Sequence, residues 1–135
     1  IAVAIDLWCD DGVASHNDES VSQDRLDECY RNMVHLSFAE PSVRVIRELT
    51  VRAASLFDDG WFDFVYVDAD HSYDGVKQDI ASWYPKVRSG GVFAGHDYLD
   101  NRTCGVKSAV NEFVQEKGLP LYISKDWTPS WFVVK

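Results

Sequence analysis

The sequence has few of the features that mark several broad classes of protein. Its 135 residues include three cysteines, Cys9, Cys29 and Cys104, in no CxxC pair. This spacing argues against a disulfide framework or a zinc site and favours reduced thiols. No apolar run approaches the ~20 residues that a membrane span needs, and no signal-peptide pattern is visible. We therefore expect a cytoplasmic protein with no membrane partner.

Positive charge is also scarce. Lys and Arg number 13 against 22 Asp and Glu, which gives a formal net charge of -9 and a pI near 4.7. Such a surface repels a phosphate backbone. Arg44, Arg47 and Arg52 are spread along a strand-like segment and form no basic patch. A small molecule is therefore the expected partner, and nucleic acid is not.

Apolar residues make up 46% of the chain, enough for a core, and they fall into alternating strand-like and helix-like segments. The predicted strands are 1–8, 42–49, 62–68, 91–98 and two closing segments, LYISKDW and PSWFVVK, that form a hairpin near Thr128 and Pro129. The predicted helices run from a capping box at Ser20 to Gln23 as far as about residue 35, then over 51–57, 73–87 and 105–118. This alternation predicts one α/β domain over 1–135, with a mostly parallel sheet, one antiparallel strand near the C-terminus and helices on both faces.

Charged residues gather where the predicted strands end. Asp6 ends the first strand, Asp68 ends the third, and His96 and Asp97 end the fourth. In an open parallel sheet these ends lie at one edge, where ligands bind. Carboxylates repel one another and are costly to desolvate, so they need a reason to gather. Three common reasons are a ribose to bind, a hard cation to bind and a proton to move.

Structural roles remain open for the same residues. Either Asp70 or Ser72 is suited to cap the helix that follows. Asp97 and His71 also fit solvated loop positions. Trp8 and Trp127 lie near predicted strand ends or loops, where packing in the core or the hairpin is favoured over lining a substrate pocket. The acids and histidines indicate a site through their grouping rather than individually.

The run FDFVYVDADHSYDGVKQDIASWYPKVRSGGVFAGHDY at 62–98, followed by GVKSAVNEF and SWFVVK, resembles the class I S-adenosylmethionine-dependent methyltransferases. The branch it is most similar to has a D-x-D-H-S-Y segment and a G-H-D strand end, and the resemblance extends back through IAVAIDLW. It implies a Rossmann-like sheet with strand order 3-2-1-4-5-7-6. The six predicted strands match the second to seventh. The family's first strand and its G-x-G cofactor loop are missing, so the resemblance implies an N-terminally incomplete domain.

The resemblance implies cofactor-binding roles for individual residues. Asp6 matches the acid that holds the ribose hydroxyls of S-adenosylmethionine. Val51, Arg52 and Ala53 match the residues that line the adenine, and Asp68 is also expected beside the cofactor.

The resemblance also implies a divalent metal, Mg²⁺ or Mn²⁺. In the metal-dependent O-methyltransferases, an acid at the end of the fourth strand binds the cation together with two residues that end the fifth strand. Asp68 matches that acid, and His96 and Asp97 match the two further ligands. His96 departs from the usual oxygen ligand there, and an imidazole favours transition metals over magnesium. Asp68 and His71 are the expected catalytic residues, with His71 as proton acceptor because its pKa lies near neutrality.

The expected activity is therefore O-methyl transfer from S-adenosylmethionine to a hydroxyl of a small molecule or sugar. Two other functions stay open. The same acids and histidines would suit a hydrolase with a metal-bound water, which would not need Asp6. Alternatively, the chain is a truncated, inactive domain that acts only by association, for example as a homo-oligomer.

Overall fold

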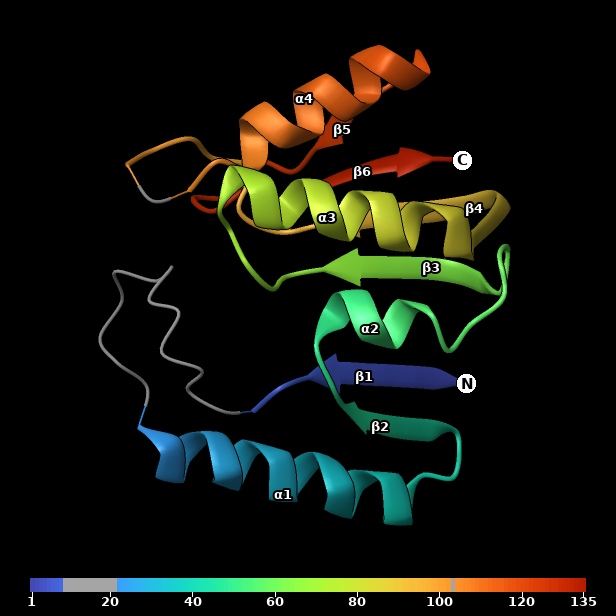
Figure 1. Ribbon diagram of the computed structural model, residues 1–135, viewed down its shortest axis with the longest axis vertical. Helices are drawn as coiled ribbons and strands as arrows, with labels where there is room; N and C mark the ends of the chain where they lie inside the picture. The colour runs from blue at the N-terminus through green and yellow to red at the C-terminus, as the bar shows by residue number, and fades with distance from the viewer. Residues whose placement is uncertain (9–21, 103) are drawn as a thin grey trace. The chain divides into compact units, whose positions relative to one another are not determined.

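The computed structural model describes residues 1–8, 22–102 and 104–135. The chain divides into two compact units, Ile1–Ala53 and Ala54–Lys135, and each is described by itself (Figure 1). Both alternate strands with helices, so the α/β class is confirmed. That they form a single domain stays a prediction. The predicted 9–20 loop, with Cys9, and the capping residue Ser20 lie outside the described residues, and Cys29 and Cys104 are free thiols.

The first unit pairs two parallel strands. Strand β1 (Ala2–Asp6) lies beside β2 (Val43–Arg47), with Ala2 opposite Val43 and Asp6 opposite Arg47. Helix α1 (Gln23–Ala39) connects them and extends beyond its predicted end near residue 35. It stops at Glu40, whose backbone is extended. Glu40 precedes Pro41, and the helical conformation is disfavoured for a residue that precedes proline. The short helix α2 (Thr50–Ala54) follows β2 and crosses into the second unit.

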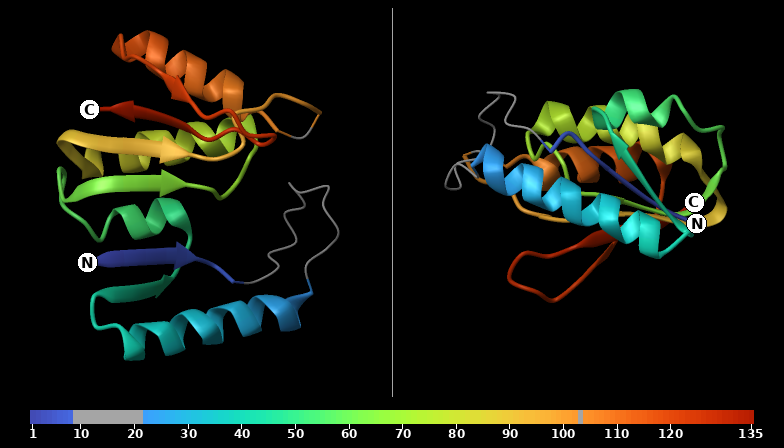
Figure 2. Two further views of the ribbon diagram at one scale, coloured as in Figure 1. Left: turned by 180° about the vertical axis from the view of Figure 1, so that it is seen from behind. Right: turned by 90° about the horizontal axis from the view of Figure 1, so that it is seen from below.

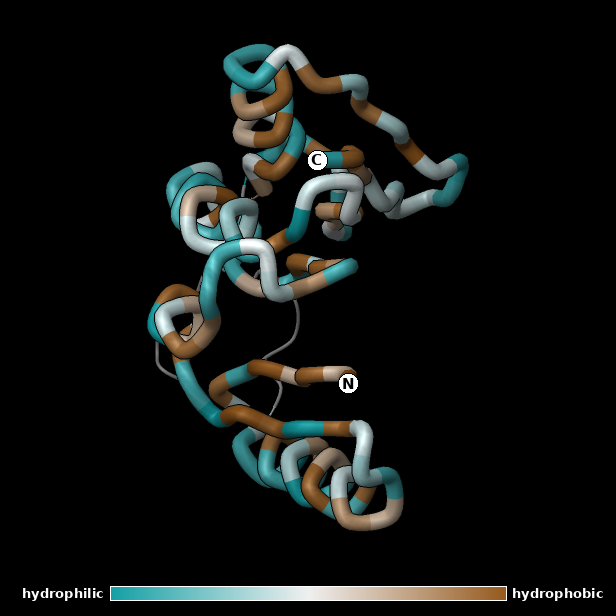
Figure 3. Tube along the Cα trace, turned by 90° about the vertical axis from the view of Figure 1, so that its right-hand side faces the viewer, coloured by the Kyte–Doolittle hydropathy of each residue, from teal (hydrophilic) through white to brown (hydrophobic). Residues whose placement is uncertain are grey.

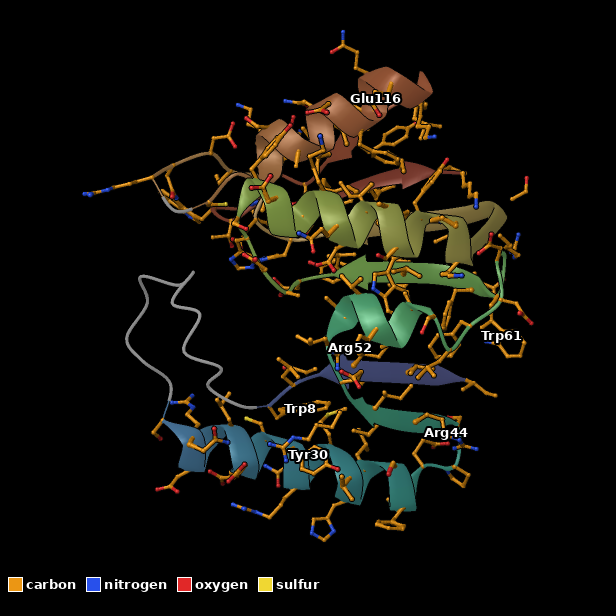
Figure 4. The ribbon with its side chains drawn as sticks, viewed as in Figure 1. Trp8, Tyr30, Arg44, Arg52, Trp61 and Glu116 are labelled. Atoms are coloured by element: carbon orange, nitrogen blue, oxygen red, sulfur yellow. The ribbon has the colours of Figure 1, made fainter. Side chains whose placement is uncertain are left out.

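The first unit buries its apolar residues only shallowly. Strand β1, which begins at the N label in Figure 3, is coloured mainly as hydrophobic, yet its residues are exposed or half-buried. Helix α1 has no buried residue. The exceptions are Ala53, which is fully buried, and Trp8, only 6% exposed, whose ring packs 5.2 Å from that of Tyr30 (Figure 4). The expectation that Trp8 serves packing is confirmed.

The second unit contains a four-stranded sheet. Its strands are β3 (Phe62–Val67), β4 (Val87–Gly95), β5 (Tyr122–Ile123) and β6 (Trp131–Val134), in the order β3-β4-β6-β5. Strands β3 and β4 are parallel, whereas β6 is antiparallel to both its neighbours, as predicted for the C-terminal hairpin. With the β1-β2 pair, these orders match the 3-2 and 4-5-7-6 portions of the expected sheet. The expected first strand is not among the described residues.

Two helices cover one face of this sheet. Helices α3 (Tyr73–Trp83) and α4 (Val106–Lys117) pack side by side (Figure 2). Their buried residues meet an aromatic cluster in which Phe93 lies 5.4 Å from Trp131 and 6.1 Å from Phe113 between ring centroids. On the other face, within the described residues of this unit, Phe64, Tyr66 and Phe132 are exposed. The core therefore lies between the sheet and these two helices.

The boundary between α3 and β4 differs from the prediction. The pattern predicted a helix to 87, stopped by Ser89-Gly90-Gly91, and a strand from 91. Instead α3 ends at Trp83, a 3₁₀ turn, η1 (Tyr84–Lys86), follows, and β4 begins at Val87. Pro85 lies inside that turn and cannot donate a helical hydrogen bond. Gly90 has a φ of 74°, and the β3–β4 register shifts between Phe62 and Phe64, so the glycines form an irregularity within the strand.

The remaining predicted bounds differ by a few residues. The strand predicted at 42–49 is β2, the helix predicted at 51–57 is α2, and the helix at 105–118 is α4, which Gly118 ends with a φ of 64°. Within the described parts of the chain, no helix combines the length and the apolar character needed to cross a bilayer.

Candidate functional site

The ends of β3 and β4 bring two acids to one edge of the sheet in the second unit. Val67 pairs with Gly95 in the parallel register, and the His96 N–H donates to the Val67 carbonyl at 3.1 Å. Asp68 directly follows β3, and Asp97 comes two residues after β4 ends. The expectation that these two strands end at the same edge is therefore confirmed.

Two histidines join these acids. His71 Nε2 lies 3.1 Å from Asp68 Oδ1 and 3.4 Å from Asp97 Oδ2, and His96 Nδ1 lies 3.2 Å from the same Asp97 oxygen. One ligand atom from each of Asp68, His71 and Asp97 lies within 4.8 Å of the others. No other group of this kind occurs among the described residues. We call these three residues the acid–histidine cluster.

The cluster is open to a ligand. The side chain of Asp68 is 49% exposed, that of His71 is 28% exposed and that of Asp97 is 19% exposed. The group is therefore neither a buried ion-pair network nor a set of fully solvated surface charges.

A turn directly before α3 positions His71. The Ser72 side chain accepts a hydrogen bond from the Gly75 N–H at 3.1 Å, so Ser72 caps the helix. Asp70 Oδ1 accepts from the Ser72 N–H at 2.8 Å and supports that cap. The backbone of His71 is held as well, because its carbonyl accepts from the Gly105 N–H at 2.8 Å. The capping alternative is thus confirmed for Ser72, and Asp70 supports the turn.

Asp97 adopts an unusual backbone conformation. Its φ is 51°, in the left-handed region that non-glycine residues rarely occupy and that aspartate tolerates better than most. The next residue is fixed, since the Tyr98 N–H donates to the Pro129 carbonyl at 2.8 Å. Backbone strain of this kind concentrates at functional sites. The left-handed turn directs the Asp97 carboxylate toward both histidines.

The cluster shifts the titration of His71. Its hydrogen bond to Asp68 raises the pKa of His71 above the ordinary value of 6.5, the negative charges of Asp97, Asp68 and Asp70 add to the rise, and partial burial opposes it. A proton therefore occupies the centre of the cluster more readily than it would on an isolated histidine. A histidine must be in its neutral form to ligate a metal, so a cation bound by His71 competes with that proton.

The residues expected at the cofactor belong largely to the first unit. Asp6 ends β1 and is exposed, and its Oδ1 accepts from the Trp8 N–H at 3.0 Å. Val51 and Arg52 are exposed on α2, while Ala53 is fully buried, which leaves it no exposed side-chain surface. Asp68 lies in the cluster of the second unit. The roles expected for these residues stay predictions.

The structure gives His71 a place that the sequence pattern did not. The predicted metal ligands were Asp68, His96 and Asp97, with His71 as a proton acceptor. In the structure His71 groups with Asp68 and Asp97, and His96 contacts Asp97 beside them. The three-residue spacing from Asp68 to His71, across one tight turn before a helix, is the signal that points to this grouping.

Comparison with known proteins gives one family. A family model described as a methyltransferase domain matches residues 2–98, more than half of the chain. No curated protein matches the sequence.

Several solved structures have a similar fold. A protein from Corynebacterium glutamicum aligns at a TM-score of 0.62 with 15% identity, over 98% of this chain and 59% of that one. An O-methyltransferase family protein from Burkholderia thailandensis aligns at 0.67 with 12% identity, over 98% and 43%. The MycE methyltransferase of mycinamycin biosynthesis, in complex with Mg, SAH and mycinamycin VI, aligns at 0.53 with 21% identity, over 71% and 32%. At these identities the likeness shows the fold alone, and the chain spans less than two thirds of each protein.

Proposed function

Because the chain belongs to the methyltransferase domain family, we propose that the whole protein transfers a methyl group from S-adenosylmethionine to a hydroxyl oxygen of a small molecule or sugar. The observation that carries this proposal is the acid–histidine cluster at the carboxyl edge of a parallel strand pair. Ligands bind at this edge in open α/β sheets. The fold likeness to a methyltransferase that holds Mg and SAH supports the same assignment.

Asp6 is the proposed ribose-binding residue for the methyl donor. It is exposed at the end of β1, and its Oδ1 accepts a hydrogen bond from the Trp8 N–H at 3.0 Å. A carboxylate can accept hydrogen bonds from both hydroxyls of a ribose. Val51 and Arg52, exposed on α2, supply the surface proposed to lie against the adenine.

The cluster fits a divalent cation. Asp68 and Asp97 offer carboxylate oxygens and His71 offers an imidazole nitrogen, a mixed donor set that suits Mn²⁺ better than Mg²⁺. We propose these three residues as ligands, with His96 as a neighbour that orients Asp97. A divalent cation held there would lower the pKa of an acceptor hydroxyl.

The chemical step is a displacement in which every atom is accounted for. The acceptor hydroxyl loses its proton to His71 or, where a cation would occupy the cluster, to water; its oxygen bonds to the methyl carbon, and the carbon–sulfur bond breaks to release S-adenosylhomocysteine. Asp97 and Asp68 hold and orient the acceptor hydroxyl. Where no cation is bound, His71 accepts the proton, and its raised pKa shifts the onset of that role to higher pH than for an ordinary histidine.

Substitution of the two cluster acids tests the proposal. Asp97→Asn suits the left-handed backbone at that position and removes only the charge. With labelled S-adenosylmethionine and a panel of hydroxyl acceptors, we expect Asp97→Asn or Asp68→Asn in the whole protein to lower kcat/KM about a hundredfold. The exposed Asp58→Asn is the matched control and should leave the rate unchanged. Full activity in both cluster variants would overturn the site.

A second variant separates methyl transfer from hydrolysis. Asp6→Ala should weaken binding of S-adenosylhomocysteine at least about tenfold, measured by isothermal titration with and without Mn²⁺. An unchanged affinity would exclude Asp6 as the ribose ligand. Hydrolytic activity that survives Asp6→Ala but not Asp97→Asn would instead identify a metal-dependent hydrolase. Cytoplasmic location, a small-molecule partner and self-association stay predictions.

A further inference from the structure

Trp127 is fully exposed at the tip of the β5–β6 connection. Its relative exposure is 100%, which contradicts the expectation that it packs in the hairpin. Tryptophan is highly buried on average, and burial of its side chain removes roughly 150–250 Å² of surface from water. The hairpin base buries Trp131, at 1% exposure, whereas the tip leaves Trp127 without cover. An indole held in water in this way is suited to meet a ligand.

The base of this hairpin is fixed by hydrogen bonds. The Ser124 N–H donates to the Ser130 carbonyl at 2.9 Å, and the Ser130 N–H donates to Ser124 Oγ at 2.9 Å. The Tyr66 hydroxyl lies 2.9 Å from Ser130 Oγ and joins the hairpin base to β3. The tip that carries Trp127 therefore projects from an anchored base.

The hairpin lies at the same edge of the sheet as the acid–histidine cluster. Trp131 at the start of β6 pairs with Gly95, and Gly95 pairs with Val67 on the other side. The chain continues from Gly95 to Asp97 and from Val67 to Asp68. The contact between the Tyr98 N–H and the Pro129 carbonyl joins the residue after Asp97 to the second residue after Trp127. Trp127 therefore stands two residues along the hairpin from a backbone contact with the segment that follows Asp97.

The chemistry of an indole face defines the ligand class. A flat aromatic surface stacks on another ring, either on an aromatic face or on the apolar C–H face of a sugar. An open-chain alcohol offers no such face. The exposed Lys125 and Asp126 directly precede Trp127 and carry opposite charges, so together they favour no net charge in a ligand.

We propose that Trp127 binds the methyl acceptor, and that the acceptor is an uncharged ring that bears a hydroxyl. The inference rests on the proposed function, since the acceptor hydroxyl must reach the acid–histidine cluster. The ring stacks on Trp127 while its hydroxyl extends toward Asp97. Trp127 therefore selects ring acceptors over open-chain ones.

Nuclear magnetic resonance of the indole N–H groups tests the binding directly. The spectrum of the protein labelled with ¹⁵N shows one signal for each of five tryptophans, and Trp127→Phe identifies that of Trp127. Catechol, methyl glucoside and 1,2-propanediol are the probes. We expect saturable movement of the Trp127 signal with at least one ring probe and none with propanediol. The ring probe that acts distinguishes an aromatic acceptor from a sugar. The signal of Trp61, 61% exposed in the same unit, is the internal control.

Variants give the second readout. Trp127→Ala should raise the KM for the ring acceptor about tenfold with kcat within about twofold, and Trp127→Phe should restore most of the loss. Binding of S-adenosylhomocysteine should be unchanged, and Trp61→Ala should match the native protein. Equal movement of the Trp61 and Trp127 signals, or an unchanged KM in Trp127→Ala, would overturn the inference while methyl transfer stands. Saturable ring binding at Trp127 without methyl transfer in any preparation would overturn the proposed function and leave the ring site.

Discussion

The two compact units both alternate strands with helices, but they differ in how deeply they bury their apolar residues. In the second unit, Phe93, Trp131 and Phe113 form a closed aromatic core beneath α3 and α4. In the first, α1 has no buried residue and β1 is half-buried at best. The acid–histidine cluster lies on the well-packed unit, and the proposed ribose ligand Asp6 lies on the thinly packed one. The residues proposed to act on the methyl acceptor therefore lie on a more deeply packed unit than the residue proposed to bind the methyl donor.

The physical origin of this difference is the number of covered strands. A parallel sheet is normally buried on both faces, and a two-stranded sheet is too small to form a core by itself. The second unit has four strands and two helices that share one apolar face. We therefore expect the stability of the protein to reside mainly in the second unit.

The largest expected effect is on stability, and three tryptophan substitutions test whether the two units differ in it. Trp131→Ala should lower the free energy of unfolding by about 3 to 5 kcal/mol, because it removes a ring at the centre of the core. Trp8→Ala should cost about 2 kcal/mol or less, since the ring of Tyr30 beside it is itself half-buried. Trp127→Ala is the exposed control and should cost nothing measurable. Urea unfolding measures all three, and a Trp8 cost equal to that of Trp131 would refute the comparison.

A metal titration sharpens the comparison at the level of the site. His71→Ala should weaken Mn²⁺ binding about a hundredfold, because it removes a ligand, and His96→Ala only about tenfold, because it removes a neighbour of Asp97. Asp6→Asn, in the first unit, should leave Mn²⁺ affinity unchanged. Electron paramagnetic resonance of free Mn²⁺ measures each affinity. An equal loss of Mn²⁺ affinity in the two histidine variants would indicate that His96 is also a metal ligand.

The smallest expected effect is a dependence of stability on pH. Because the folded pKa of His71 is raised, its contribution is fully present below the unfolded value of 6.5 and is lost as pH rises through the folded pKa. Stability measured by urea unfolding without metal should therefore fall across this range. Asp68→Asn removes the largest cause of the shift and should flatten that fall. An equal fall in both proteins would assign it to another group.

Part of the fold and of the site was predictable from local pattern. The apolar run before Asp68 and the G-H-D segment marked two strand ends, and parallel geometry placed both at one edge. The start of β4 was not predictable in this way, because Val87 to Gly91 contains the glycines that usually end a helix. The pairing of Val87 with Phe62 on β3, together with the backbone hydrogen bonds that join Gly90 and Gly91 to Lys135, overrides that local signal.

Side-chain direction set the other limit. Whether His71 or His96 joins the two acids depends on the turn that Asp70 and Ser72 build, and a residue pattern carries no such geometry. The exposure of Trp127 is similar in kind. A tryptophan between two strands packs or projects according to hairpin closure, which here depends on the hydrogen bonds between Ser124 and Ser130.

Gly75 has no functional group, yet the acid–histidine cluster depends on the absence of a side chain at this position. A Cβ atom added there would lie 2.3 Å from Asp70 Oδ2 and 2.7 Å from Asp70 Cβ. Substitution of Gly75 by any other amino acid therefore displaces Asp70. Because Asp70 supports the Ser72 cap, this also displaces the turn that holds His71. A mutational scan should find position 75 as intolerant as the cluster itself, although an inventory of functional groups would pass over it.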